Sequence, residues 1–109
     1  MTYEELLAAV KSAAGKADGS SVKKHLAVQF NIEGDAAGTF YLEVRDGKIM
    51  VEPYDYKDRD ILVTCKAETL LGILAGKTDV IGAYLTRKLK AEGDLGRAND
   101  LKAIIKGGQ

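Results

Sequence analysis

Few side chains in this sequence are of the types that perform acid–base or nucleophilic chemistry. His25 is the only histidine, and it follows Lys23 and Lys24, which is typical of a surface position. Cys65, the only cysteine, falls on the apolar side of an alternating segment, where a small thiol packs well. A nucleophilic cysteine needs a base beside it, and no sequence feature brings His25 near Cys65. The sequence therefore predicts a protein that is not an enzyme.

Two segments have residue types that hold ions or phosphates, and neither has the required spacing. Asp55, Asp58 and Asp60 lack the one-residue alternation, the central glycine and the distal glutamate of a calcium loop. Residues 72–78 read GILAGKT, but a phosphate-binding loop has four residues between its glycines and this segment has three. The first glycine also lies within an apolar helical run. We therefore predict no metal site and no cofactor.

The composition is that of one small globular domain. The chain has 109 residues, of which 46% are hydrophobic and 29% charged, and we treat residues 1–109 as a single domain. Its 16 basic and 16 acidic side chains balance, which argues against nucleic-acid binding, because that binding requires a basic excess. A lone cysteine, an acidic start unlike a signal peptide and no apolar run of ~20 residues predict a cytoplasmic protein.

Hydrophobic periodicity predicts an N-terminal helix followed by a β meander. Thr2 and Glu5 have the spacing of a capping box, and apolar residues recur behind them at helical intervals. A short helical turn is expected over residues 22–25. Alternating apolar residues then predict three strands, with an Asp46–Gly47 turn joining the second to the third and Pro53 ending the third.

The second half of the chain is expected to alternate between strands and helices. A polar crossing segment over residues 54–60 precedes a fourth strand, after which the period becomes helical. Two short helices are expected, the first ended by Gly76 and the second capped by Thr78. A weak fifth strand follows over residues 88–92, and Asp94 is expected to cap the last helix. The pattern predicts an α+β fold.

The order and spacing of several short motifs resemble the sterol carrier protein type 2 family over residues 22–105. These motifs are Val22-Lys23-Lys24, the strand around Phe30, the Asp46-Gly47 hairpin, the Leu70-Leu71 helix with Gly76-Lys77, the segment Lys88-Leu89-Lys90 before Gly93-Asp94, and the helix from Ala98 to Leu101. The resemblance implies a five-stranded, mostly antiparallel sheet covered on one face by about five helices around an apolar tunnel. In the family, this tunnel accepts fatty acids, fatty acyl-CoA, sterols or similar lipids.

The resemblance also implies which residues line the tunnel. They are Phe40, Leu42, Val63 and Cys65 from the sheet, Leu74, Ile81, Tyr84 and Leu85 from the middle helices, and Leu101 and Ile105 from the last helix. The basic cluster Arg87, Lys88 and Lys90 has two interpretations: it is a solvated face at the start of a strand, or Arg87 or Lys88 meets a ligand carboxylate or phosphate at the mouth of the tunnel. Arg87 stands where the family usually has glycine, and Ala91 is smaller than the branched residue that is common at its position.

The sequence thus predicts non-enzymatic binding, and transfer within the cell, of fatty acids, fatty acyl-CoA or sterol-like molecules in a hydrophobic cavity. At most transient contact with a membrane surface is expected, and a homodimer is left open. The alternative is a structural or dimerisation module whose apolar groove is filled by a protein partner. A third, enzymatic hypothesis would use Tyr84 or the loop from Asp55 to Asp60, but nothing in the spacing supports it.

An empty tunnel would be costly for a small domain. At ~24 cal/mol per Å³, a void of ~300 Å³ would cost about 7 kcal/mol, which is comparable to the whole stability of a domain. We therefore expect the ligand-free form to be collapsed, wet or filled by a lipid. The chain lacks the peroxisomal C-terminal tripeptide of many eukaryotic family members, which favours a microbial cytoplasmic protein.

Overall fold

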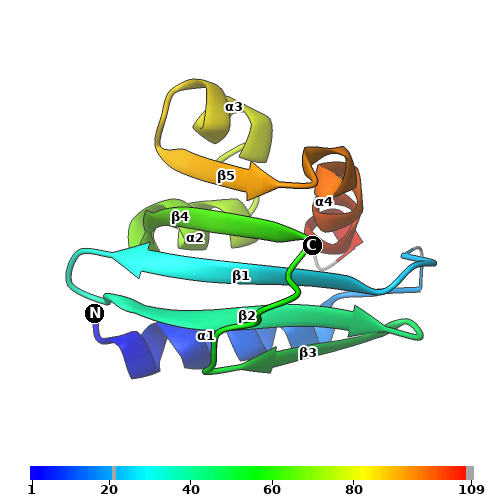
Figure 1. Ribbon diagram of the computed structural model, residues 1–109. Helices are drawn as coiled ribbons and strands as arrows, with labels where there is room; N and C mark the ends of the chain where they lie inside the picture. The colour runs from blue at the N-terminus through cyan, green and yellow to red at the C-terminus, as the bar shows by residue number, and fades with distance from the viewer. Residues whose placement is uncertain (21, 108–109) are drawn as a thin grey trace.

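A five-stranded sheet in the order β3-β2-β1-β4-β5 forms the centre of the fold (Figure 1). The computed structural model describes residues 1–20 and 22–107, with side chains up to residue 104. The strands are β1 (Leu26–Glu33), β2 (Gly38–Arg45), β3 (Lys48–Glu52), β4 (Ile61–Lys66) and β5 (Leu89–Gly93). Every neighbouring pair is antiparallel except β1 and β4, which are parallel. The prediction of an α+β fold with a mostly antiparallel sheet is confirmed.

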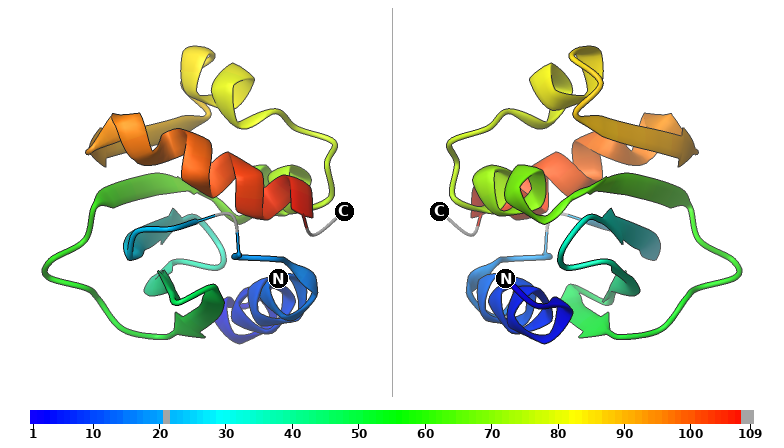
Figure 2. Two further views of the ribbon diagram at one scale, coloured as in Figure 1. Left: turned by 90° about the vertical axis from the view of Figure 1, so that its right-hand side faces the viewer. Right: turned by 90° about the vertical axis from the view of Figure 1, so that its left-hand side faces the viewer.

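The helices gather on one face of this sheet. They are α1 (Tyr3–Lys16), α2 (Ala67–Leu74), α3 (Val80–Leu85), the 3₁₀ helix η1 (Leu95–Arg97) and α4 (Ala98–Gly107). Figure 2 shows α1, α2 and α4 on one side of the strands, and α3 at the end of the molecule beyond β5. The described residues thus hold four α-helices, where about five helices were expected.

The missing helix is the turn expected over residues 22–25, and that prediction is wrong. Residues 22–25 form irregular chain with a bend at Lys24, and this chain leads into β1. The guanidinium of Arg97 donates to the backbone carbonyls of Lys24 and His25, each at 3.0 Å. These carbonyls therefore bind a distant side chain, and they accept no bond from a following helical turn.

The signals at the start of the chain and at the β2–β3 turn are confirmed. The backbone N–H of Glu5 donates to the Thr2 hydroxyl at 3.1 Å, and the Thr2 N–H donates to the Glu5 carboxylate at 3.0 Å, which makes a complete capping box. Asp46 and Gly47 have φ angles of 53° and 78°, as a type I′ hairpin turn requires. β3 is an edge strand that ends just before Pro53.

Two of the predicted helix caps are wrong. Thr78 does not cap α3; the carboxylate of Asp79 does, accepting from the Gly82 N–H at 2.9 Å. Asp94 precedes η1 without a side-chain capping bond, and α4 begins only at Ala98. At α3 the polar residues Thr78 and Asp79 are adjacent, and the sequence does not rank them as caps. After Asp94 a separate 3₁₀ turn comes before α4, so Asp94 is too far from the first turn of α4 to cap it. Gly76, with φ of 75°, follows α2 as predicted.

The connection from β3 to β4 crosses the sheet face that the helices leave open (Figure 2). Its Tyr56 N–H donates to the Gln29 side chain at 3.0 Å, and its last residue, Asp60, donates to the Ala27 carbonyl at 2.8 Å. This crossing lets β4 run parallel to β1, since parallel neighbours cannot be joined by a tight turn. One face of the sheet is therefore packed by helices and the other by a polar loop.

Candidate functional site

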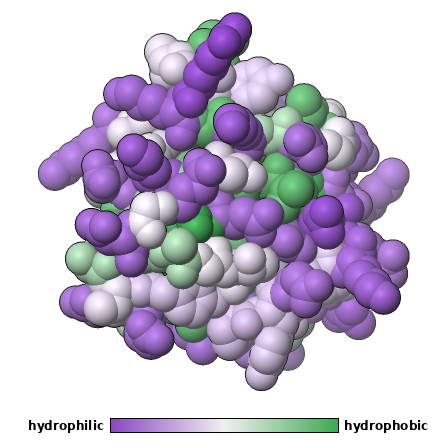
Figure 3. Space-filling view, turned by 60° about the vertical axis from the view of Figure 1, so that its left-hand side comes forward, coloured by the Kyte–Doolittle hydropathy of each residue, from purple (hydrophilic) through white to green (hydrophobic). Residues whose placement is uncertain are grey.

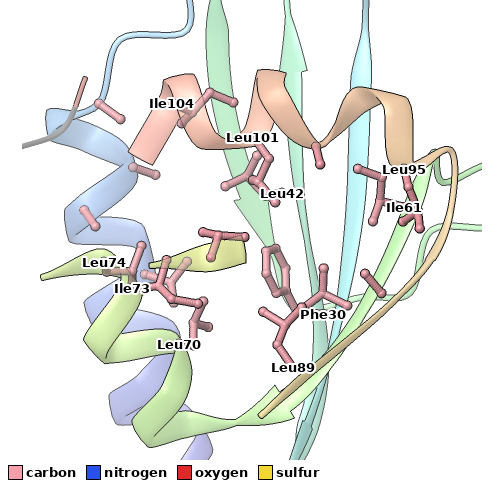
Figure 4. Close-up of a pocket in the computed structure, with 18 residues that line it drawn as sticks. Phe30, Leu42, Ile61, Leu70, Ile73, Leu74, Leu89, Leu95, Leu101 and Ile104 are labelled. Atoms are coloured by element: carbon pink, nitrogen blue, oxygen red, sulfur yellow. The ribbon is translucent and has the colours of Figure 1, made fainter. Parts of the chain in front are cut away.

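An apolar pocket of about 90 Å³ lies between the sheet and helices α1, α2 and α4. In Figure 4, side chains of α1, α2 and the strands point toward one central space, and α4 lies across one end of that space. All of the lining residues are apolar: Val10, Ala13, Ala14, Ala17, Phe30, Leu42, Ile61, Val63, Leu70, Ile73, Leu74, Val80, Leu89, Ala91, Leu95, Ala98, Leu101 and Ile104.

The strands build one wall of the pocket from side chains that point to the same face of the sheet. Phe30 of β1 pairs with Val63 of β4, which in turn pairs with Ala91 of β5. These three side chains line the pocket in one row across the sheet, because cross-strand partners share a face. Side-chain size falls along this row toward the edge, from phenylalanine to valine to alanine. The small Ala91 therefore leaves space at the β5 end.

The facing wall comes from α1 and α2. Val10, Ala13 and Ala14 follow the helical repeat, with Ala17 just beyond the helix end, and their short side chains bring the α1 backbone close without filling the space. In the same wall, α2 contributes the larger side chains of Leu70, Ile73 and Leu74. Small residues on one helix and large ones on the other leave the pocket between them.

Arg97 fixes the helix that closes the pocket. Besides its bonds to the carbonyls of Lys24 and His25, its Nε donates to the Asp100 carboxylate at 2.7 Å. Its guanidinium also lies 3.9 Å from the carboxylate of Asp60. Arg97 thereby joins the start of α4 to the segments that precede β1 and β4, and this holds Leu101 and Ile104 over the pocket.

The chemistry that this pocket supports is limited to apolar contact. Its lining has no side chain that can donate, accept or transfer a proton. Elsewhere in the described residues, no three histidine, cysteine, aspartate or glutamate side chains are grouped to hold a metal ion. No helix of that part of the chain is long and apolar enough to cross a bilayer. The arrangement can bind an apolar group by burial.

Four of the residues that the sequence predicted for the ligand site line this pocket: Leu42, Val63, Leu74 and Leu101. Phe40 is fully buried, with its ring centroid 5.1 Å from that of Phe30, but it does not reach the pocket. Cys65 is also buried outside the lining, and burial raises the pKa of its thiol to about 11, with Glu33 adding to the rise. This thiol remains protonated at neutral pH.

The structure does not bring the α3 residues into the pocket. Ile81, Tyr84 and Leu85 are exposed, because α3 turns Val80 and Ala83 toward the rest of the molecule. Arg87 and Lys88 are exposed after α3 and are not in the lining, so their contact with a ligand head group stays a prediction. Ile105 belongs to α4, but its side chain lies outside those described.

The contribution of α1 is what sequence reasoning missed. The resemblance covered residues 22–105, so no residue of the first helix entered the expected site. A signal was present: Val10, Ala13, Ala14 and Ala17 continue one apolar stripe in which bulk decreases toward the helix end. A stripe of small residues facing a core indicates either close packing or spare volume, and here it borders spare volume.

The opposite face of the sheet carries a polar cluster centred on Glu43. Its carboxylate, on a side chain only 8% exposed, accepts from the Tyr56 hydroxyl at 2.8 Å and from Arg45 at 3.1 Å, and contacts His25. Burial alone raises the pKa of Glu43, but the hydrogen bonds from His25, Tyr56 and Arg45 outweigh it, and the pKa lies below its usual value. The same bond to Glu43 raises the pKa of Tyr56, with burial adding to the rise.

The chain belongs to the SCP-2 sterol transfer family, whose pattern it matches over residues 4–106. This is a family of lipid-binding domains, and the observed five-stranded fold is the one found in its solved members. No curated protein sequence matches the chain significantly.

Solved structures with this fold come from proteins of different kinds. Palmitated SCP2L2 from Aedes aegypti is 24% identical, with a TM-score of 0.68, and the match covers 96% of this chain and 95% of that one. Sterol carrier protein 2 from Yarrowia lipolytica in its apo form is 23% identical, with a TM-score of 0.57 over 95% and 76%.

A sec-alkylsulfatase from Pseudomonas sp. contains a region of the same shape. The identity is 21% and the TM-score 0.75, and the match covers 84% of this chain. This chain spans only about 15% of the length of the sulfatase, so the fold occurs both alone and as part of a larger enzyme. At these identities, the three structures show the fold alone.

Proposed function

We propose that this protein binds a fatty acyl chain or a similar apolar lipid in the pocket between the sheet and helices α1, α2 and α4, and carries it without chemical change. The observation that supports this most directly is the lining of the pocket, in which all eighteen residues are apolar. Such a surface favours a ligand only by removing apolar area from water.

The size of the pocket constrains how a lipid would bind. An empty volume of about 90 Å³ costs about 2 kcal/mol at ~24 cal/mol per Å³, which a marginally stable domain can tolerate. The space equals only about three water volumes, so a long acyl chain needs the helices to move apart. Burial of each methylene contributes about 0.8 kcal/mol, which offsets the cost of that opening.

One solved structure of this fold supports a fatty acid as the ligand class. One solved structure is of palmitated SCP2L2, and another is of a sterol carrier protein in its apo form, so structures of this fold exist both with and without a ligand. In this chain the pocket offers no polar partner, and the carboxylate of a fatty acid would therefore remain outside the lining. Fatty acyl-CoA and sterols remain in the proposed class.

The test is the thermal stability of lipid-free protein with added palmitate. A ligand that binds only the folded state raises the free energy of unfolding by about 2.7 kcal/mol at a hundredfold excess over its Kd. For a domain of this size the melting temperature should rise by about 10 °C or more. If palmitate, palmitoyl-CoA and cholesterol all leave the melting temperature unchanged while gel filtration shows a dimer, the proposal fails in favour of a groove filled by protein.

A matched pair of variants locates the binding site. Leu101→Phe places a larger side chain in the pocket and should weaken palmitate binding at least tenfold. Leu62→Phe makes the same change in strand β4 on the loop-covered face of the sheet, and should leave the affinity unaltered. Equal losses in both variants would show that palmitate binds elsewhere.

A further inference from the structure

The short helix α3 exposes its largest side chains. Ile81, Tyr84 and Leu85 have the spacing that places them on one side of a helix, and they are 43%, 43% and 73% exposed. Its inward side holds only Val80 and Ala83. A helix oriented for core packing turns its larger apolar side chains inward, and α3 does the reverse.

The segment around α3 is basic, although the whole chain is electrically neutral. From residue 77 to residue 90 there are four basic side chains and one acidic side chain, Asp79, which caps α3. The basic residues are Lys77, Arg87, Lys88 and Lys90, and all are exposed. Within the described part of the chain, none of them forms an ion pair. Their charge is therefore available to an anionic partner.

α3 lies at the end of the molecule, where a large flat partner can reach it. In Figures 1 and 2 it projects beyond β5, away from α1 and the rest of the sheet. The space-filling view shows apolar and hydrophilic residues side by side in this upper region (Figure 3). Val80, at the start of α3, lines the pocket. The exposed side of α3 and the pocket are therefore on two sides of one helix.

We propose that Ile81, Tyr84, Leu85, Arg87 and Lys88, here called the α3 surface, dock the protein on an anionic lipid bilayer. Large apolar side chains beside basic ones are the combination that binds the interface of a membrane with acidic head groups. The purpose of this docking, exchange of lipid with the pocket, rests on the function proposed above. The docking itself is argued from the exposure and charge of α3 alone.

A protein partner fits the α3 surface less well. A stable protein interface buries about 800 Å² on each side, and a helix of six residues offers only a small part of that area. A bilayer requires no matching shape, and each Lys or Arg held near an anionic surface contributes about 1 kcal/mol, which corresponds to roughly a fivefold change in affinity.

The test is flotation of the lipid-free protein with vesicles of phosphatidylcholine containing 30% phosphatidylglycerol. Binding should be at least tenfold weaker to vesicles of phosphatidylcholine alone, and should weaken in about 0.5 M salt, because screening removes the electrostatic part. Leu85→Ser should reduce partition into the anionic vesicles about tenfold. Tyr54→Ser, a change at another highly exposed side chain, should have no effect.

The contribution of charge has its own matched pair. Arg87→Gln with Lys88→Gln should lower binding to anionic vesicles about twenty-five-fold, whereas Lys48→Gln with Lys57→Gln, which changes the net charge equally, should lower it less than twofold. Equal losses in the two pairs, or a Leu85-dependent dimer in gel filtration, would overturn the docking proposal. If Leu101→Phe keeps normal palmitate binding but Leu85→Ser loses the vesicles, the pocket proposal fails and the docking surface stands.

Discussion

The two faces of the sheet are packed in different ways, although the same strands supply both. On the helix-covered face, apolar side chains meet around a pocket of about 90 Å³. On the loop-covered face, Gln29 and Glu43 are buried, and in the described residues every buried side-chain nitrogen or oxygen has a hydrogen-bond partner. Apolar packing, which is non-directional, stabilises the first face. Hydrogen bonds, which require particular distances and angles, stabilise the second.

This difference suggests how a small domain combines rigidity with an adaptable site. Apolar walls can separate and close again because any apolar group can replace another. A buried carboxylate with three donors cannot move without leaving charges or donors unpaired. We therefore expect the loop-covered face to hold the strands in register while the helices on the other face adjust to a ligand. Two substitutions and one titration test that division, and a third substitution probes a residue outside both faces.

The largest effect is expected on the apolar face. Ile73 of α2 is almost fully buried and lines the pocket, so Ile73→Ala should lower the free energy of unfolding by about 3 kcal/mol through lost burial and a larger void. Saturating palmitate should restore part of this loss by filling the void. Chemical denaturation with and without palmitate measures both, and a loss that palmitate leaves untouched would contradict an adaptable pocket.

The next effect concerns the polar cluster. Glu43→Gln keeps the shape of the side chain but removes the charge that His25, Tyr56 and Arg45 share, and it should cost about 2 kcal/mol of stability. Palmitate affinity should be unchanged, because the cluster lies on the other face. Glu52→Gln, on a more exposed side chain of the edge strand β3, is the control and should cost almost nothing. A changed palmitate affinity would show that the two faces are coupled.

The pH dependence of stability should report the same cluster. The pKa of Glu43 is lower in the folded protein than in the unfolded chain, so the folded state favours the ionised form. Its contribution is therefore present above the unfolded value of about 4.5 and is lost as the pH falls through the folded pKa. The pKa of Tyr56 is raised, so its contribution is lost as the pH rises past 10. The melting temperature of Glu43→Gln, measured across pH, should therefore fall less steeply than that of the unmodified protein as the pH drops below about 4.5.

The smallest effect is expected at Arg87, outside both faces. Its φ angle of 64° lies in the left-handed region, which favours glycine. Arg87→Gly should raise the free energy of unfolding by about 0.5 kcal/mol, because relief of strain exceeds the added entropy of the unfolded chain. Arg87→Ala keeps the Cβ atom and should give no gain. Equal melting temperatures for the glycine and alanine variants would remove strain as the explanation.

The sequence predicted the sheet better than it predicted the site. Alternation in segments such as Val28, Phe30 and Ile32 specifies a strand and its inward face, because a one-residue shift would bury polar groups. The orientation of α3 was not predictable in this way. Its sequence, VIGAYL, is apolar on more than one side, and the choice of the small Ala83 as the inward residue depends on the neighbouring strand β5.

The pocket lining required the tertiary arrangement. Leu42 and Leu101 were predicted because the resemblance to the family implied, position by position, that they line the tunnel. Ala14 and Ala17 were missed, since an alanine on an apolar stripe gives no sign of whether the space in front of it is filled. The polar cluster was missed as well, because Glu43 and Tyr56 lie on segments that meet only when the loop crosses the sheet.

The parallel pairing of β1 with β4 has a consequence for how the chain folds. The strands β1 to β3 are joined by short turns and can pair while the rest of the chain is still unfolded. β4 can add to β1 only after the segment with Tyr56 has crossed the completed hairpins, so its docking closes a long loop and should come late. Helices α2 and α4 follow β4 in the chain, so until β4 docks they cannot complete the cover over Phe30 and Leu42. We therefore expect newly made chains to be most exposed to aggregation at the surface that later forms the pocket.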